Sequence, residues 1–435
     1  MEGRLKAGTT LTSNSGTTYK VIRFLDSGGQ GEVYEVEGGG RRYALKWYFP
    51  AMATELQKTI LKNLILRGSP DRSFLWPLDM ASLPGGKSEL FGYIMELRPG
   101  NYRSIRDLMK RSADPTFYVL CRAAFNLVKG YKTLHDEGYC YRDISFGNLF
   151  FDPETGDVLI CDNDNVTYNG AEYSAVTGTP RFMAPEIGRG ESVPSRNTDQ
   201  WSLAVLLFYI FMLNHPLEGK HEADIRCLDL AAMNYLYGTD PVFIYDPEET
   251  SNRPVEGYQD NALIYWGLYP QELRDLFIHS FTVGISRPNS RVTEGQWLDA
   301  LANMMSGIMT CPKCGAEIFY DPVKRQAGEA HKCWNCRAKA KAPLHIRIGK
   351  SIVPVSVGAR LYSHHLREDY DMETVRGVVV ENPRKPGILG IMNKDDVNWI
   401  YIRANGTHAA VAPERSASAA AGAMIDFGSV RGVFE

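Results

Sequence analysis

The chain has no apolar run long enough to cross a membrane and no leader of the secretory type. Its longest hydrophobic stretch, residues 201–213, contains 13 residues, whereas a membrane span needs about 20. The opening sequence, MEGRLKAGTTLTSNSG, is predominantly polar and lacks the apolar core of a signal peptide. We therefore expect a cytoplasmic protein with no membrane partner, in which residues 201–213 form a buried core helix.

The chain also lacks an excess of charge of either sign and has no internal repeat. It contains 48 Lys and Arg against 51 Asp and Glu, which gives a formal net charge of −3. A balance of this kind provides no overall attraction to nucleic acid. Hydrophobic residues at 44% and charged residues at 23% exclude a disordered or fibrous chain. At 435 residues the chain exceeds what one core usually organises, so we expect two or three domains.

Cysteine is scarce outside one short segment. Four of the eight cysteines are scattered in apolar surroundings, and without a secretory leader we expect them to be reduced and buried. These four are Cys121, Cys140, Cys161 and Cys227. The other four form the pairs CPKC and CWNC, with 18 residues between the pairs. This clustering calls for a separate explanation.

The two Cys-x2-Cys turns aim four thiolates at one point, which is the tetrahedral sulfur environment that Zn²⁺ prefers in closed structural sites. We predict a zinc ribbon over residues 308–342, with iron or a redox disulfide pair as alternatives. The predicted ligands are Cys311, Cys314, Cys333 and Cys336. We expect His331 to be an ordinary surface residue. The segment is basic, but no aromatic platform accompanies it, which favours a spacer or protein-docking module over a nucleic-acid site.

The hydrophobic pattern changes from strands to helices near residue 98. Alternating apolar and polar residues predict three antiparallel strands between residues 18 and 47, and further strands near 74–80 and 89–96. Between them, residues 51–66 repeat apolar side chains at helical spacing. Helical patterns then dominate to about residue 305. A small β-rich lobe followed by a larger helical lobe is the predicted outline.

A glycine-rich turn, LDSGGQGEVYEV at residues 25–36, joins two of the predicted strands. Gly28 and Gly31 let backbone amides approach phosphates closely, and Val33 follows where it would cover the face of an adenine ring. The pattern is incomplete, because Asp26 replaces its first glycine. The turn is a candidate phosphate-binding loop.

The next strands supply further candidates for nucleotide binding. Ala44 and Lys46 in YALKWY stand at the distance from the glycine loop expected of a lysine that grips the α- and β-phosphates of ATP. The segment GYIMELRPG is a candidate hinge, with Met95 as the gatekeeper and the backbone of Glu96 and Arg98 at the adenine edge.

The loop YRDISFGNLFF at residues 141–151 has the outline of a phosphoryl-transfer loop. Asp143 is placed to accept the proton of a substrate hydroxyl, and Asn148 follows at the spacing of a metal ligand. Asp162 in LICDNDN ends an apolar strand, where a Mg²⁺-binding aspartate is expected. The string GTPRFMAPE at residues 178–186 is typical of the end of an activation segment.

With these motifs in this order, residues 18–304 resemble a eukaryotic-type Ser/Thr protein kinase domain of the kind found in bacteria. The resemblance implies an α+β, bilobal fold with an N-lobe at 18–97 and a C-lobe at 98–304. It also implies that Asp199 braces the catalytic loop and that Arg291 pairs with Glu186. The implied cofactors are ATP and Mg²⁺, with Lys46, Asp143, Asn148 and Asp162 as the catalytic set.

The implied function is transfer of the ATP γ-phosphate to protein hydroxyls, in bacterial signalling or stress response. Thr179 in GTP is of the kind seen in Ser/Thr kinases, and a phosphate on Ser174 or Thr177 would pair with Arg142. The alternative function is a pseudokinase scaffold that binds nucleotide and partner proteins without transferring phosphate.

The sequence departs from the kinase pattern at several positions. Ser145 replaces a lysine that reaches the γ-phosphate, so we expect slower chemistry. Tyr141 replaces a histidine, and Asn163 with Asp164 replaces the usual Phe-Gly. The helix that should supply a partner for Lys46 offers two candidates, one acidic and one neutral, and the sequence leaves the choice between them open. They are Glu55 and Gln57.

The last segment, residues 344–435, returns to short strands separated by Gly, Pro and Asn, which predicts a β-sandwich-like interaction domain. Its end faintly resembles forkhead-associated phosphopeptide-binding domains. We expect His364 and His365 to be packed or exposed and not to be ligands. The order of kinase, ribbon and β domain resembles bacterial kinases associated with von Willebrand A-type proteins and 2C-type phosphatases, which are therefore the expected partners beside the protein substrates.

Overall fold

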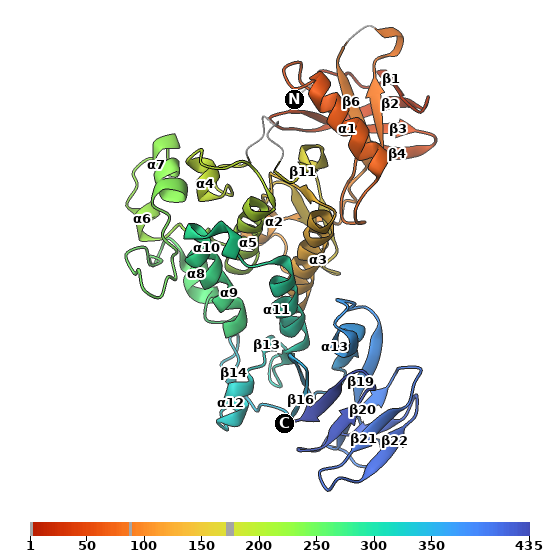
Figure 1. Ribbon diagram of the computed structural model, residues 1–435, viewed down its shortest axis with the longest axis vertical. Coiled ribbons are helices and arrows are strands. Elements are labelled where there is room, and N and C mark those ends of the chain that lie inside the picture. The colour runs from red at the N-terminus through yellow and green to blue at the C-terminus, as the bar shows by residue number, and fades with distance from the viewer. Residues whose placement is uncertain (1–2, 87–88, 171–177) are drawn as a thin grey trace. The chain divides into compact units, whose positions relative to one another are not determined.

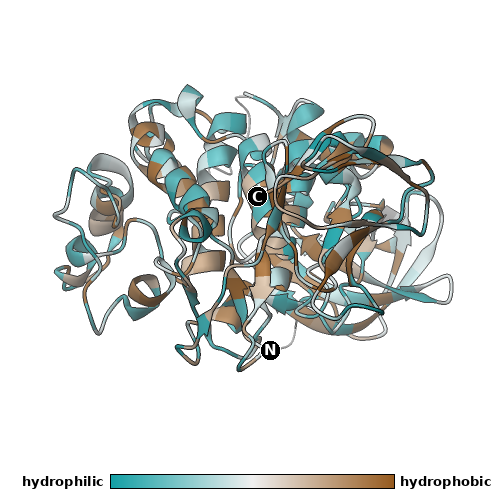
Figure 2. Ribbon diagram, turned by 90° about the horizontal axis from the view of Figure 1, so that it is seen from below, coloured by the Kyte–Doolittle hydropathy of each residue, from teal (hydrophilic) through white to brown (hydrophobic). Residues whose placement is uncertain are grey.

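The structure is a computed structural model that describes residues 3–86, 89–170 and 178–435. It divides into two compact units. Unit 1 comprises Met1–Asp114, Asn126–Asp260 and Ile278–Glu294, and unit 2 comprises Pro115–Phe125, Asn261–Phe277 and Gly295–Glu435. The helices and many of the strands of both units are labelled in Figure 1. Figure 2 colours them by hydropathy, and hydrophobic stretches lie mainly on helices and strands, whereas many loops are hydrophilic.

A closed barrel forms the N-lobe of unit 1. Its strands follow the order β1-β2-β3-β4-β6-β5, and antiparallel pairing of β1 with β5 closes it. The strands are β1 (Thr10–Ser13), β2 (Thr18–Ser27), β3 (Gly31–Gly38), β4 (Arg41–Tyr48), β5 (Asp79–Ser82) and β6 (Phe91–Glu96). The three strands predicted between residues 18 and 47 are confirmed. The barrel also contains β1, which the sequence analysis did not identify.

Two of the predicted boundaries in this lobe were wrong. The strand expected near 74–80 begins only at Asp79, because Phe74 forms an isolated bridge to Ile160. The helix expected from residue 51 is α1 (Glu55–Arg67), which begins late because the side chain of Thr54 accepts a hydrogen bond from the Gln57 amide and caps it.

Helices make up most of the C-lobe. Those wholly in unit 1 are α2 (Ile105–Met109), α4 (Pro185–Gly188), α5 (Arg196–Met212), α6 (Lys220–Ala223), α7 (Leu230–Asn234) and α10 (Val283–Ser286). The others are α3 (Phe117–Asp136), α8 (Asp260–Tyr265), α9 (Gln271–Phe281) and α11 (Glu294–Ser306). In α5 every residue from Thr198 to Met212 is buried, which confirms the predicted core helix. Across the three described ranges, none of the helices has the length and apolarity needed to span a bilayer.

Short strands connect these helices near the candidate site. They are β7 (Arg103–Ser104), β8 (Tyr139–Cys140), β9 (Leu149–Phe151), β10 (Val158–Ile160) and β11 (Thr167–Tyr168). β9 pairs with both β10 and β7, and β8 pairs with β11. The catalytic loop predicted from Asp143 to Asn148 therefore lies between β8 and β9, and Asp162 follows β10.

In unit 2, two hairpins carry the four clustered cysteines. They are β12 (Ile308–Thr310) with β13 (Glu317–Phe319), and β14 (His331–Lys332) with β15 (Lys339–Ala340); α12 (Pro322–Gln326) lies between them. His331 was expected on the surface, and that prediction was wrong. Its ring is buried, stacks on Tyr320 and accepts a hydrogen bond from the Asp321 amide at 2.7 Å.

Two antiparallel sheets follow in unit 2, and one apolar cluster contains residues of both. The first sheet is β16 (His345–Ile348), β17 (Ser351–Pro354), β21 (Trp399–Ile402), β22 (His408–Val411), β24 (Met424–Asp426) and β25 (Arg431–Phe434). The second is β18 (Arg360–Tyr362), β19 (Val375–Glu381), β20 (Leu389–Asn393) and β23 (Ser416–Ser418), and α13 (Ser363–Arg367) follows β18. This β-rich region is compatible with the sandwich-like domain predicted over residues 344–435.

The scattered cysteines and the paired histidines lie in different surroundings. Cys121 and Cys140 are buried, as expected, and Cys161 is half-buried, but the prediction of a buried side chain was wrong for Cys227, which is exposed. It stands in a segment between α6 and α7 that has no regular structure. His364 and His365 are both buried on α13.

A buried charge cluster holds the catalytic loop against α5. The carboxylate of Asp199 accepts hydrogen bonds from the backbone amides of Tyr141 and Arg142, at 2.5 and 2.9 Å. The ring of His135 lies between Asp199 and Glu294, with nitrogen–oxygen distances of 3.0 and 2.7 Å. Burial lowers the pKa of His135, but the hydrogen bonds to these two carboxylates outweigh it and raise the pKa to about 9. His135 is therefore protonated at neutral pH and completes the brace around Asp199.

We expect His135 to titrate near pH 9 in the folded protein. Because its folded pKa is above the unfolded value of about 6.5, the stability it contributes is fully present below pH 6.5 and is lost as the pH rises through 9. The loss amounts to about 3 kcal/mol. Side-chain NMR of histidine-labelled protein, with His135→Asn to assign the signal, measures the pKa. A signal that titrates near pH 6.5 would contradict the protonated brace.

Candidate active site

The catalytic loop brings two of the predicted residues together with a third from the activation segment. The side-chain amide of Asn148 donates to the carbonyl oxygen of Asp143 at 2.9 Å. The hydroxyl of Thr179 donates to Oδ1 of Asp143 at 2.7 Å. Both contacts fix the orientation of Asp143, the predicted acceptor of the substrate proton.

Tyr141 connects this loop to the strand that leads to Asp162. Its buried hydroxyl donates to the carbonyl oxygen of Cys161, and the Cys161 amide donates to the carbonyl oxygen of Asn148 at 2.9 Å. A tyrosine therefore fills the position of the expected histidine and supports the geometry of the loop.

Asp162 has a backbone conformation that suits a functional residue. Its φ is 53°, in the left-handed region that non-glycine residues seldom adopt. Burial raises its pKa, and Lys46 opposes that rise at an Nζ–Oδ1 distance of 3.4 Å. The side chain is still 39% exposed, so one face remains accessible to a metal ion. Asp162 and Asn148 have the oxygen ligands that Mg²⁺ prefers.

Lys46 is nearly buried and is surrounded by acceptors. Its ammonium group contacts both carboxylate oxygens of Asp164, at 2.9 and 3.0 Å, and the side-chain oxygen of Gln30 at 2.8 Å. Burial lowers its pKa, but the charges of Asp164 and Asp162 outweigh that effect and hold the pKa above its usual value. Lys46 is therefore a fixed cation at the position predicted for phosphate binding.

The two candidates for the acidic partner of Lys46 do not fill that role. The Glu55 carboxylate is exposed and pairs with Lys58 at 3.3 Å. The side-chain amide of Gln57 donates to the Asp164 carbonyl oxygen at 3.0 Å. The sequence analysis considered only residues on the helix, and so it missed Asp164. The acidic residue two places after Asp162 was the available signal.

The predicted nucleotide-binding residues lie in or beside one apolar cluster. Ala44 and Met95 belong to this cluster, and Val33 packs against it while remaining partly exposed. Leu97 and Leu159 are also partly exposed there. These side chains provide an apolar wall that suits the face of an adenine ring.

The hinge and the glycine loop frame this wall. Glu96 ends β6, and the Arg98 guanidinium lies 4.0 Å from the centroid of the Phe150 ring. A Cβ at Gly31 would lie 2.3 Å from the Trp47 carbonyl oxygen, so the sheet itself requires glycine there. A Cβ at Gly28 would meet no atom within 4 Å, so packing in the structure does not require glycine there.

The remaining predictions for this site concern a missing lysine, two candidate phosphorylation sites and one ion pair. Ser145 is buried in the catalytic loop, so a neutral hydroxyl stands where the kinase pattern has a lysine. Ser174 and Thr177, the candidate phosphorylation sites, lie outside the described residues. The expected pair of Arg291 and Glu186 is present as two hydrogen bonds of 2.8 Å each.

The four clustered cysteines form a second candidate site, in unit 2. All four sulfur atoms lie within 4.8 Å of one another. The Cys311–Cys336 and Cys314–Cys333 sulfur separations are both 3.7 Å. A Zn–S bond of about 2.3 Å implies about 3.8 Å between the sulfurs of a tetrahedron, whereas a disulfide needs about 2.05 Å. The sulfur positions therefore fit a tetrahedral metal ion, and the four thiols form no disulfide with one another.

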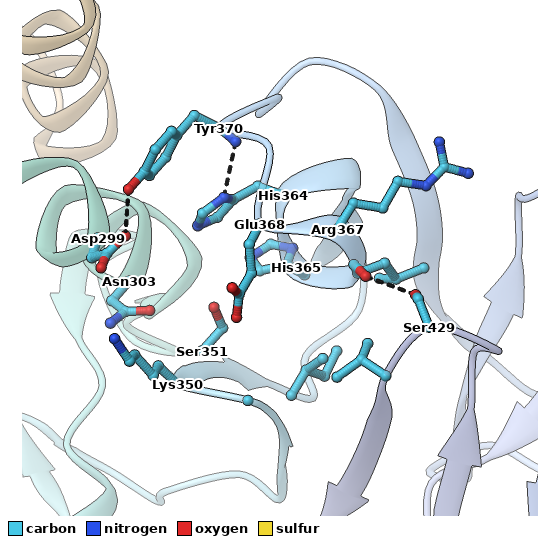
Figure 3. A pocket seen from close by; sticks show the side chains of 14 residues that line it. Asp299, Asn303, Lys350, Ser351, His364, His365, Arg367, Glu368, Tyr370 and Ser429 are labelled. Atoms are coloured by element: carbon cyan, nitrogen blue, oxygen red, sulfur yellow. Dashed lines mark hydrogen bonds between the residues drawn. The ribbon is translucent and has the colours of Figure 1, made fainter. Parts of the chain in front are cut away.

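Unit 2 also contains a polar pocket of about 460 Å³ (Figure 3). Lys350 and Arg367 line it together with Asp299 and Glu368, so its charges balance. His365, a further lining residue, is occupied by hydrogen bonds that join Nε2 to the Ser306 hydroxyl, at 2.7 Å, and the Tyr362 amide to Nδ1, at 2.8 Å. The lining defines no class of ligand.

The fold and the catalytic set define a protein kinase. The protein kinase domain family model matches residues 19–293, more than half of the chain, and the chain therefore belongs to that family.

Several curated kinases are similar to this chain. Protein kinase C delta type of mouse is 27% identical over 233 residues, which are 51% of this chain and 33% of that protein. Protein kinase YegI of Escherichia coli is 22% identical over 330 residues, 71% of this chain and 48% of that protein. Protein kinase C-like 1 of Candida albicans is 35% identical over 106 residues, 23% of this chain and 9% of that protein. The alignments thus span at most about half the length of these relatives.

We expect Thr179→Ala to lower kcat for phosphate transfer by roughly 10- to 100-fold, because the hydroxyl that orients Asp143 is lost. Thr179→Ser keeps the hydroxyl and is the matched control. The measurement is the initial rate of transfer from labelled ATP at saturating substrate. Equal rates for the alanine and serine variants would contradict this role for the hydroxyl.

Proposed function

We propose that this protein is an ATP- and Mg²⁺-dependent Ser/Thr protein kinase that transfers the γ-phosphate of ATP to protein hydroxyls, as part of a bacterial signalling or stress response. The observation that carries the proposal is the convergence of Asp143, Asn148, Asp162 and Lys46 in unit 1, with Thr179 bonded to Asp143. These side chains provide a proton acceptor, two metal ligands and a phosphate-binding cation, the set required for phosphoryl transfer.

Each residue has a distinct role in the proposed reaction. Asp143 accepts the proton of the attacking hydroxyl, and Thr179 keeps its carboxylate oriented toward that proton. Lys46 neutralises the α- and β-phosphates. Asn148 and Asp162 would hold Mg²⁺, which supplies charge neutralisation for the transferring group. Val33, Ala44 and the backbone near the hinge orient the adenine.

The rival function is a nucleotide-binding scaffold without transferase activity. Ser145 favours it, because the cation expected at that position is missing. Two observations weigh against it. Phosphoryl transfer depends mainly on positioning and electrostatics, and every side chain that would touch the metal or the transferred proton is present. We therefore expect an active enzyme with a reduced rate.

Asp143→Asn is expected to lower phosphate transfer by about 10²- to 10⁴-fold, because an amide cannot accept the proton. Asp224→Asn, which changes an exposed aspartate directly after α6, is the matched control. Incubation with labelled ATP and phosphoamino-acid analysis measure both the transfer and the hydroxyl type. Candidate substrates are the chain itself, a von Willebrand A-type protein and a general acceptor such as casein. Transfer by wild type no greater than by the Asp143 variant, on all three, would support the scaffold.

We also propose that the four-cysteine cluster holds a structural Zn²⁺. The sulfur separations fit a tetrahedral site, and Cys311 and Cys333 are buried within a small apolar cluster of the ribbon. Four thiolates complete the coordination shell and leave no position for a substrate. The ion would link the β12–β13 hairpin to the β14–β15 hairpin, since each hairpin carries two of the cysteines.

The purified full chain is expected to contain one zinc ion, and Cys333→Ser is expected to lose it and to lower the melting temperature of unit 2. Cys227→Ser, which makes the same substitution outside the cluster, should keep both the metal and the melting temperature. Metal analysis by mass spectrometry and thermal unfolding provide the readouts. Iron in place of zinc, or full metal content in the Cys333 variant, would contradict the assignment.

A further inference from the structure

Asp164 lies at the centre of a buried hydrogen-bond cluster in the N-lobe side of unit 1. Its side chain is 0% exposed, and both of its oxygens are engaged. Lys46 contacts both oxygens, while the hydroxyls of Tyr93 and Tyr48 donate to Oδ1 and Oδ2 respectively. A buried carboxylate with this many donors is fully satisfied, which is the condition for keeping such a charge in the interior.

The two tyrosines act only as donors in this cluster. Burial, and after it the charge of Asp164, raises the pKa of Tyr48 and of Tyr93 well above the usual value. Both phenols therefore stay protonated throughout the physiological range and hold the carboxylate in place. Tyr48 lies two residues after Lys46 on β4, and Tyr93 lies opposite Lys46 on β6. The two tyrosine donors therefore come from β4, the strand of Lys46, and from its neighbour β6.

Helix α1 contributes no carboxylate to this cluster among the described contacts. In protein kinases the strand lysine normally pairs with a glutamate on this helix. Here Gln57 faces the cluster, and its amide donates to the Tyr48 hydroxyl at 3.2 Å and to the backbone carbonyl of Asp164. The acid on the same helix, Glu55, is 87% exposed at its side chain. The charge that the helix usually supplies comes from another segment.

We propose that Asp164 is the positioning residue for Lys46 and replaces the helix glutamate. The inference rests on the proposed function and specifies how its phosphate-binding lysine is held. Asp164 belongs to the segment Asn163–Asn165, directly after Asp162. The orientation of Lys46 is thus tied to the segment that carries the proposed metal ligand, whereas the polar contact of α1 with this cluster comes from the neutral amide of Gln57.

A second link joins the same segment to the glycine loop. Gln30 accepts from Lys46 through its side-chain oxygen and donates from Nε2 to Oδ1 of Asn165 at 2.9 Å. Asp162 and Asp164 contact Lys46 directly, and Asn165 contacts Gln30, which accepts from Lys46. All three contacts come from one short stretch of chain. This arrangement makes the Asp162–Asn165 segment, and not α1, the element that sets the geometry of the lysine.

The test compares removal of each carboxylate by an isosteric change. Asp164→Asn should lower kcat/KM for ATP by about 100-fold, whereas Glu55→Gln should leave it within twofold. The double variant Asp164→Asn with Gln57→Glu, which returns the acid to the helix, should recover at least tenfold over Asp164→Asn alone. The KM for Mg²⁺ should change in Asp162→Asn and stay constant in Asp164→Asn, since Asp164 is not proposed as a ligand.

Binding of a fluorescent ATP analogue provides a readout that does not need catalysis. If the wild type transfers no phosphate, the proposed function fails, but a weaker binding by Asp164→Asn than by Glu55→Gln still supports the positioning role. Thermal unfolding identifies variants that do not fold. Because the Glu55 side chain is solvent-exposed, Glu55→Gln tests the proposal even where Asp164→Asn is unfolded. Loss of activity or binding in Glu55→Gln, or wild-type values for a folded Asp164→Asn, would overturn it.

Discussion

The position of the catalytic loop depends on one buried carboxylate, that of Asp199 on α5. It accepts hydrogen bonds from the backbone amides of Tyr141 and Arg142, and it contacts the protonated ring of His135. A buried charge is stable only when donors satisfy it, and removal of one partner leaves the rest uncompensated. Asp143 directly follows Arg142 in the chain. A core helix therefore sets the location of Asp143, the proposed proton acceptor, and contacts from Asn148 and Thr179 orient it.

A similar principle operates on the N-lobe side of the site. Asp164 joins β4 and β6 to the segment after β10, as Asp199 joins the loop to α5. In each case a carboxylate on a helix, or just after a strand, accepts hydrogen bonds from a neighbouring element. Tyr141 connects the two systems. Its backbone amide donates a hydrogen bond to Asp199, and its hydroxyl donates one to the carbonyl oxygen of Cys161. The proposed proton acceptor, metal ligand and phosphate-binding lysine are thus connected through these hydrogen bonds and the peptide bond between Cys161 and Asp162.

The sequence predicted the parts of the site that obey fixed local spacings. Asp143 and Asn148 belong to one short loop between β8 and β9, and Asp162 follows β10, the partner of β9, so local spacing was enough to predict all three. The same reasoning placed the cysteine pairs, whose turns are also local. Asp164 escaped it because the contact with Lys46 spans 118 residues of sequence, and no periodic pattern encodes which of two segments supplies a buried charge.

The wrong predictions of burial for His331 and Cys227 have the same origin. His331 stands beside a cysteine pair in a polar segment, yet it is buried, with its ring stacked on Tyr320 and bonded to the Asp321 amide. Cys227 has apolar neighbours in sequence, but it is exposed in the irregular segment between α6 and α7. Burial at these positions follows from tertiary packing, which composition and periodicity do not report.

The balance of charge in the site bears on how the proposed reaction reaches its rate. Lys46 contacts two carboxylates, Asp162 and Asp164, so part of its positive charge is already compensated before a nucleotide binds. Ser145 adds no cation near the transferring group. Neutralisation of the developing phosphate charge would therefore fall mainly to the divalent ion held by Asn148 and Asp162 and to the backbone amides of the glycine loop. The Asp162–Asn165 segment carries the proposed metal ligand Asp162 and positions Lys46. Its movement would therefore shift the metal ion and the lysine together.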